Sequence, residues 1–178
     1  MYIKFYQYVE EKNMSYQEKK TLANMFTGVV LLVIYCLYAW NKYTAQAAPI
    51  DDLAYWARLI LIFLVIEVCA FIVIQILFHI LFSIGIAVRE KIHNPDRDEK
   101  NLDKIINHEM VEDERDKLIE MKSMRWGSIL VGLSFGASLI TLAAGVPTLV
   151  MLNIMFIAFS FSSVLDGSVQ LYYLRKGV

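Results

Sequence analysis

The sequence predicts an all-α protein, a four-transmembrane-helix bundle in which the second and third spans extend into a helical hairpin outside the membrane. Of its 178 residues, 57% are hydrophobic, whereas a soluble domain is usually nearer half apolar. The apolar residues gather into four blocks, which is typical of membrane spans. Charged segments separate these blocks, and the most highly charged segment lies between the second and third blocks.

Residues 1–20 are expected to form an N-terminal interfacial segment ahead of one membrane domain, residues 21–178. Two interpretations of this segment are open. It can lie as a helix in the headgroup region, with its tyrosine hydroxyls in water, or it can be a frayed start of the next helix. Ser15 followed by Glu18 fits a capping box that begins the first span.

The first span, about residues 21–43, ends in an aromatic belt of Tyr38, Trp40 and Tyr43. The second span begins near Ala54, and its apolar run continues to Val88. A helix of ~35 residues is ~50 Å long, against ~30 Å of hydrocarbon. The second helix is therefore expected to tilt strongly or to project beyond the membrane.

Residues 89–125 are expected to be a charged helical hairpin. Asn94-Pro95-Asp96 predicts a helix stop followed by a restart. The stretch after it contains no Gly or Pro up to Met124, so one helix is predicted to run on into the third span, about residues 126–144. A tight turn at residues 145–147 then leads into the fourth span, about residues 148–174.

Lysine and arginine predict the orientation of the chain. Fifteen of the seventeen lie in residues 1–20, 89–125 and 175–176. The positive-inside rule therefore places both termini and the hairpin in the cytoplasm. An odd number of spans would put these basic segments on opposite sides of the membrane, so the charge asymmetry also supports four spans. The protein is therefore expected in the lipid bilayer of the cell membrane.

Glu67 lies near the predicted midplane of the membrane. A charged side chain there costs ~2.5–3.5 kcal/mol on insertion scales, so it should face the bundle interior, be protonated or be paired. Two roles are open: a proton or cation site, or a carboxyl group that holds the bundle together by a hydrogen bond to a neighbouring helix.

Asp166 and Arg125 are expected at one depth, since they lie nineteen and twenty residues from the turn at 145–147. An ion pair between them is predicted, with either a structural or a gating, anion-binding role. His79 and Gln75, on the inner half of the second span, are candidates for the same polar layer, either as structural residues or, for His79, as a ligand.

Residues 108–120 carry one histidine and several acids at steps of three and four. They form either a solvated face of salt bridges or a weak divalent-metal site; the prediction is the solvated face, with no metal. A second pattern, Ser128, Gly132 and Gly136, lets two helix backbones approach closely. This contact is expected within the bundle or across a homodimer.

No nucleotide-binding, hydrolase or haem motif is found, and HEMVE at residues 108–112 lacks the second histidine of a zinc protease. We therefore expect no catalytic residue and no cofactor. The net charge of −1 also argues against direct nucleic-acid binding.

The run from Glu112 to Ile119, followed by Lys122, Arg125 and Gly127, resembles the charged "DERD" signature of an uncharacterised family of small prokaryotic four-span membrane proteins. Residues 149–177 are similar to that family's last helix and basic tail, and residues 15–20 to its polar start. The loop at residues 89–111 is longer than the corresponding loop expected in that family. Members of this family, whose function is unknown, are often encoded beside small helix-turn-helix regulators.

The resemblance implies a regulatory, sensing or immunity-type protein rather than an enzyme. We expect it to dock a cytoplasmic partner, such as a basic helix-turn-helix regulator, on the hairpin residues Glu112, Asp113, Glu114, Arg115 and Asp116. The alternative is a small ion- or proton-coupled transporter lined by Glu67, His79, Arg125 and Asp166. A third hypothesis, a lipid-directed enzyme using a metal at residues 108–120, is the weakest.

Overall fold

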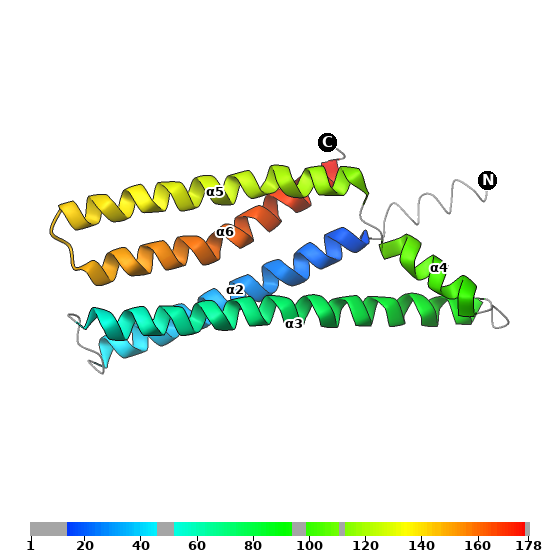
Figure 1. Cartoon of the computed structure of the whole chain (residues 1–178), viewed down its shortest axis with the longest axis horizontal. Helices are drawn as coiled ribbons and strands as arrows, with labels where there is room; N and C mark the ends of the chain where they lie inside the picture. The colour runs from blue at the N-terminus through cyan, green and yellow to red at the C-terminus, as the bar shows by residue number, and fades with distance from the viewer. Residues whose placement is uncertain (1–13, 46–51, 94–98, 111–112, 177–178) are drawn as a thin grey trace.

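The computed structural model describes residues 14–45, 52–93, 99–110 and 113–176. Within these ranges the chain is helical without strands (Figure 1), which confirms the all-α prediction. Most of the expected interfacial segment, residues 1–20, lies outside them. The helices are α2 (Tyr16–Thr44), α3 (Leu53–His93), α4 (Glu99–Met110), α5 (Glu114–Ala143) and α6 (Thr148–Lys176).

Four of these helices, α2, α3, α5 and α6, are long and apolar enough to span a membrane. Many of the large hydrophobic side chains of these helices are exposed on the outside of the molecule. A surface of this kind is expected where lipid, rather than water, surrounds the helices. The predicted four-span bundle is therefore confirmed.

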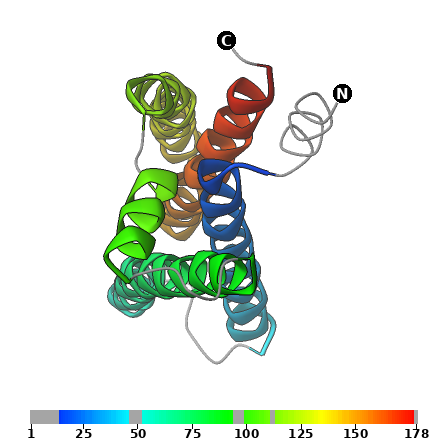
Figure 2. The same cartoon turned by 90° about the vertical axis from the view of Figure 1, so that its right-hand side faces the viewer.

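The helices form two antiparallel pairs, α2 with α3 and α5 with α6, joined by contacts between α2 and α6 (Figures 1 and 2). Helix α6 packs most extensively on α5, next on α2, and also touches α3. It is therefore the central helix of the bundle. We call the end where α2 and α5 begin and α6 ends the charged end, and the opposite end the turn end.

Local signals set the helix ends. The Glu18 amide donates to Ser15 Oγ (3.2 Å) and the Ser15 amide donates to Glu18 Oε2 (2.9 Å), which confirms the predicted capping box. At the turn end, Gly145 adopts a positive φ of 75°, and the Val146 amide donates to the Thr141 carbonyl (3.1 Å). This left-handed residue closes α5, as glycine commonly does after a helix.

Helix α3 has 41 residues, or ~60 Å at the helical rise, about twice the thickness of the hydrocarbon. In Figure 1 its last turns extend beyond α2 and α6 at the charged end, so the helix is long enough either to tilt or to project, as its apolar run predicted. Helix α4 packs on this extension, with Ser83 Oγ 3.3 Å from Met110 Sδ.

The prediction of one helix from the hairpin into the third span is wrong. Asp113 has extended backbone angles (φ −71°, ψ 155°), so α4 and α5 are separate helices. The Asp113 carboxylate accepts a hydrogen bond from the Glu114 amide (2.7 Å) and caps α5, and the acids that follow stabilise a helix N-terminus. The hairpin is therefore formed by α3 and α4.

Candidate functional site

Helix α6 carries a series of polar residues from the turn end to the charged end, and they bond to side chains or backbone of all three other spans. We call Asn153, Ser160, Asp166 and Gln170 the α6 polar series. In a membrane, where apolar surfaces gain little by pairing with each other, such hydrogen bonds and close packing hold helices together. The series is the main internal feature that positions the candidate site residues.

Glu67 of α3 faces Ser160. The Ser160 hydroxyl donates to Glu67 Oε2 over 3.1 Å, and Glu67 is only 6% exposed. The prediction that Glu67 faces the bundle interior is confirmed. Its hydrogen bond to a neighbouring helix is the contact expected of the structural role, and it is the α6 polar series' link to α3.

Asp166 meets α5 at Gly127 rather than at Arg125. The Gly127 amide donates to Asp166 Oδ1 over 2.7 Å, while the Arg125 side chain is exposed and forms no ion pair with Asp166 in the described chain. The predicted depth was right to within two residues, but the predicted pair is wrong. A step of two residues along an α-helix rotates the side-chain direction to the opposite face, so Arg125 points away from Asp166 when Gly127 faces it.

The glycine at position 127 lets this contact form without displacement of the Asp166 carboxyl group. A Cβ built there would collide with the Asp166 carboxyl group, which lies 2.7 Å from it at Cγ. The absence of a side chain lets the carboxylate reach the backbone amide. Gly127 was therefore part of the site without being identified as such from the sequence.

At the charged end, Thr21 Oγ1 donates to Gln170 Oε1 over 3.1 Å and joins α2 to α6. Beside this bond lies a cavity of about 190 Å³ between α2, α5 and α6, which we call the polar cavity. Its lining includes two acids, two amides and three hydroxyls: Glu120, Asp166, Asn24, Gln170, Thr21, Ser123 and Ser163. Phe71 of α3 also lines it.

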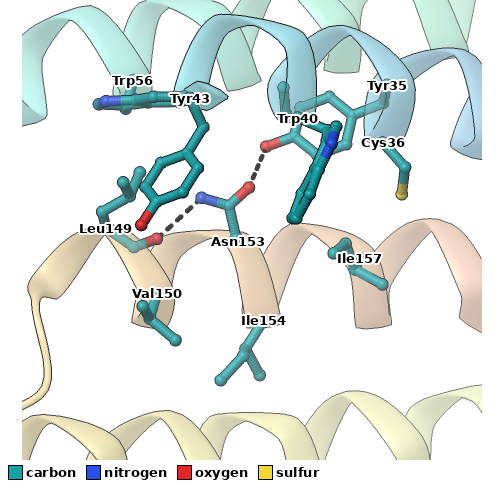
Figure 3. Close-up of a pocket in the computed structure, with 11 residues that line it drawn as sticks. Tyr35, Cys36, Trp40, Tyr43, Trp56, Leu149, Val150, Asn153, Ile154 and Ile157 are labelled. Atoms are coloured by element: carbon teal, nitrogen blue, oxygen red, sulfur yellow. Dashed lines mark hydrogen bonds between the residues drawn. The ribbon is translucent and has the colours of Figure 1, made fainter. Parts of the chain in front are cut away.

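At the turn end, Asn153 joins α6 to α2. Tyr35 Oη donates to Asn153 Oδ1 (2.7 Å), and Asn153 Nδ2 donates to the Leu149 carbonyl (2.8 Å). Figure 3 shows these two hydrogen bonds among the residues that line an open groove of about 490 Å³, most of which belong to α2 and α6. The belt residues Trp40 and Tyr43 line it together with Trp56 of α3, so two of the three aromatic residues predicted for this interface lie together.

His79 does not join the polar layer. Its side chain is exposed, whereas the Asp166 contact lies between α5 and α6. Its backbone carbonyl accepts a hydrogen bond from Ser83 Oγ (2.9 Å). Gln75 is likewise exposed.

The predicted docking residues lie at the start of α5. Asp113, Glu114 and Arg115 are exposed, and Asp116 is half-buried with a polar partner. Glu112 lies outside the part of the chain that the structure describes. Asp113 and Glu114 are therefore exposed at the charged end, and Asp113 also serves as the cap of α5.

The stripe of Ser128, Gly132 and Gly136 is not used in packing within the described chain. A Cβ added at Gly132 or Gly136 would meet nothing within 4 Å, and Ser128 is exposed. The buried face of α5 instead carries a different set of small residues, which could have been identified by their spacings of four and seven: Ser123, Gly127, Ser134 and Ser138.

The four apolar helices make this chain a helical, multi-pass membrane protein. Comparison with protein-family models, with curated proteins and with solved structures gives no match. The resemblance of residues 112–127 to the DERD-type family stays a prediction, and function is argued from the chain's own residues.

Proposed function

We propose that this chain is a non-enzymatic membrane protein of regulatory, sensing or immunity type that docks a cytoplasmic protein partner at its charged end. The observation that carries the proposal is the projection of α3. A helix of 41 residues is about twice as long as ~30 Å of hydrocarbon requires, and its last turns, with α4 packed on α3, extend beyond α2 and α6. A rigid helical surface is thereby held where a soluble protein can reach it.

The charge of this surface favours a basic partner. Residues 89–125 contain eleven acids and nine bases, and the first turn of α5 exposes Asp113 and Glu114. Complementary charge steers encounter and selects partners more than it adds affinity. The likeness to a family encoded beside helix-turn-helix regulators makes a basic DNA-binding regulator the kind of partner we propose.

The proposal requires the charged end to face the cytoplasm, and the basic residues support this. Arg175 and Lys176 end α6, and Arg175 Nε lies 3.3 Å from Glu18 Oε1 at the start of α2. Only Lys42 and Arg58 lie near the turn end. Such an asymmetry is the usual signature of a cytoplasmic side.

The test is purification from native membranes in a mild detergent, with mass spectrometry of the proteins recovered. A stoichiometric basic partner is expected, and recovery should fall several-fold for the double variant Asp113→Lys, Glu114→Lys. The control is Asp52→Lys, because Asp52 is also an exposed acid that caps a helix, with Oδ1 accepting from the Tyr55 amide (3.0 Å), but at the turn end. Absence of any partner, or equal recovery with the double variant, would contradict the proposal.

An ion- or proton-coupled transporter is the alternative proposal. Glu67 and Asp166 remain candidates for it because both face the interior, whereas Arg125 and His79 are exposed. Flux in liposomes that is abolished by Glu67→Gln would favour this alternative. Flux that is absent, or indifferent to that change, would remove it.

A further inference from the structure

The open groove of Figure 3, which we call the turn-end groove, is a concave part of the outer surface at the turn end. On its inner side lie the buried residues Tyr35, Trp56 and Leu149. On its rim, Trp40 and Ile157 are 68% and 38% exposed. The groove is therefore continuous with the apolar outer surface of the bundle, and its surroundings are lipid.

The groove follows the direction in which acyl chains lie. On α2 its lining runs from Tyr35 to Tyr43, or ~12 Å at the helical rise. On α6 it runs from Leu149 to Ile157, which is the same length. One leaflet contributes ~15 Å of the ~30 Å of hydrocarbon. The groove is thus long enough to hold an acyl chain through most of one leaflet.

Asn153 gives this apolar groove a polar group with unused capacity. Its Oδ1 accepts from Tyr35 Oη (2.7 Å), and its Nδ2 donates to the Leu149 carbonyl (2.8 Å). A side-chain amide has two N–H donors, and within the described chain only one of them has an acceptor. The second N–H is available to an acceptor that enters the groove, and hydrocarbon offers none.

The depth of Asn153 matches the ester groups of a phospholipid. Helix α6 has 29 residues, or ~43 Å, which equals the thickness of a bilayer with its headgroup regions. Asn153 lies five residues after Thr148, the start of α6, or ~8 Å from that end. This depth is the boundary between headgroups and hydrocarbon, where ester carbonyls lie. Trp40 and Tyr43, which reach from α2 toward α6 (Figure 3), are typical of the same boundary.

Headgroup charge contributes little to recognition at this end. The sequence between residues 42 and 58 contains two bases and two acids: Lys42, Arg58, Asp51 and Asp52. Their charges balance, so the turn end has no strong preference for an anionic headgroup. The features that can select a ligand are therefore the apolar groove and the amide of Asn153.

We propose that the turn-end groove binds one phospholipid of the adjacent leaflet. An acyl chain lies along Cys36 and Ile157, and an ester carbonyl of the lipid accepts a hydrogen bond from Asn153 Nδ2. The site is at the opposite end of the bundle from the surface proposed to dock a protein. It therefore does not depend on that function.

The two cysteines of the chain provide the test. Both thiols are free and exposed, but Cys36 lines the groove whereas Cys69 lies on α3 outside it. The rate of alkylation of each thiol by a small apolar maleimide is measured on the full chain in detergent micelles, as ester-linked phosphatidylcholine is added. The rate at Cys36 should fall several-fold and reach a plateau, while the rate at Cys69 stays constant.

The ether-linked analogue of the same lipid tests the hydrogen bond, because it has the same chains and headgroup but no ester carbonyl. Half-protection of Cys36 should require about five times more of the ether lipid, since one hydrogen bond contributes about 1 kcal/mol. Asn153→Leu removes the donor and should bind the ester and ether lipids equally.

If Asn153→Leu does not yield folded protein, Ile157→Trp tests the groove without changing Asn153. The larger ring narrows the groove at a residue that is 38% exposed. Native mass spectrometry should detect one retained phospholipid on the wild-type chain and none on this variant. Phe161→Trp is the matched control, at a 45% exposed position of the same helix outside the groove, and should retain the lipid.

Three results would overturn the proposal. One is equal protection of Cys36 and Cys69, which is the behaviour of annular lipid only. Another is equal protection of Cys36 by the ester and ether lipids in the wild-type chain. The last is a wild-type chain that retains no phospholipid, or an Ile157→Trp variant that retains as much as the control.

Discussion

Glu67 illustrates how far a single residue can be interpreted from sequence. An acid inside a long apolar run must face the bundle or find a partner, because hydrocarbon cannot solvate it. That much was predictable, and the structure confirms it with a buried side chain 3.1 Å from Ser160. The partner was not predictable, since a serine in an apolar helix bonds equally well to its own backbone.

Ser160→Ala tests the bond between Glu67 and Ser160. We expect a double-mutant cycle with Glu67→Gln to give a coupling free energy of about 0.6 kcal/mol, with an upper limit near 1.7 kcal/mol. The measurement is reversible unfolding in mixed micelles. Each single variant should fold. Zero coupling would mean that the hydrogen bond does not stabilise the bundle.

Gly127→Ala should destabilise the protein, because the added methyl group collides with the Asp166 carboxyl group. Overpacking of this kind typically costs about 1–3 kcal/mol of unfolding free energy. The matched control is Gly132→Ala on the same helix, where nothing lies within 4 Å of the new methyl group. The control should be neutral or slightly stabilising, since alanine favours a helix by up to about 1 kcal/mol over glycine. Equal effects of the two substitutions would contradict the close contact between α5 and α6.

At the scale of elements, lengths were easier to predict than interruptions. The apolar run of the second span predicted a helix too long for the membrane, and α3 has 41 residues. The restart at Asp113 was missed because the residues on both sides favour helix, so composition alone gave no boundary. The signal was an aspartate followed by acids, which is also a normal sequence inside a charged helix.

Asp113→Ala should loosen the first turn of α5 by removing its cap. The expected loss is about 1 kcal/mol of local stability, seen as faster amide hydrogen exchange over residues 114–117. Asp113→Asn should exchange like the wild type, because the amide oxygen can still accept from the Glu114 backbone. Unchanged exchange in Asp113→Ala would show that the acidic turn does not depend on this cap.

At the scale of the whole molecule, α6 organises the bundle. Its polar series bonds to α2, α3 and α5, whereas the sequence analysis treated Asp166 as one half of a single pair. Register between helices was not available from the sequence, and a shift of two residues separates Gly127 from Arg125. This is why the four spans and their polar depths were predicted, but their partners were not.

The unused face of α5 belongs to the same scale. If Ser128, Gly132 and Gly136 mediate a homodimer, Gly132→Leu should reduce crosslinking between copies in native membranes while leaving the monomer folded, because no atom of the described chain lies within 4 Å of a Cβ at that position. Leu133→Ala, at a neighbouring exposed position, is the control. Crosslinking that is absent in the wild type, or unaffected by Gly132→Leu, would remove the homodimer hypothesis.

The central claim is a four-span protein with its charged end in the cytoplasm, and cysteine labelling in intact cells tests it most directly. In a background with Cys36 and Cys69 replaced by serine, single cysteines are placed at Glu114 and at Ala45, both exposed. A membrane-impermeant maleimide is predicted to label Ala45→Cys in intact cells and Glu114→Cys only after permeabilisation. The reverse pattern, or labelling of both in intact cells, would contradict the account and with it the docking of a cytoplasmic partner.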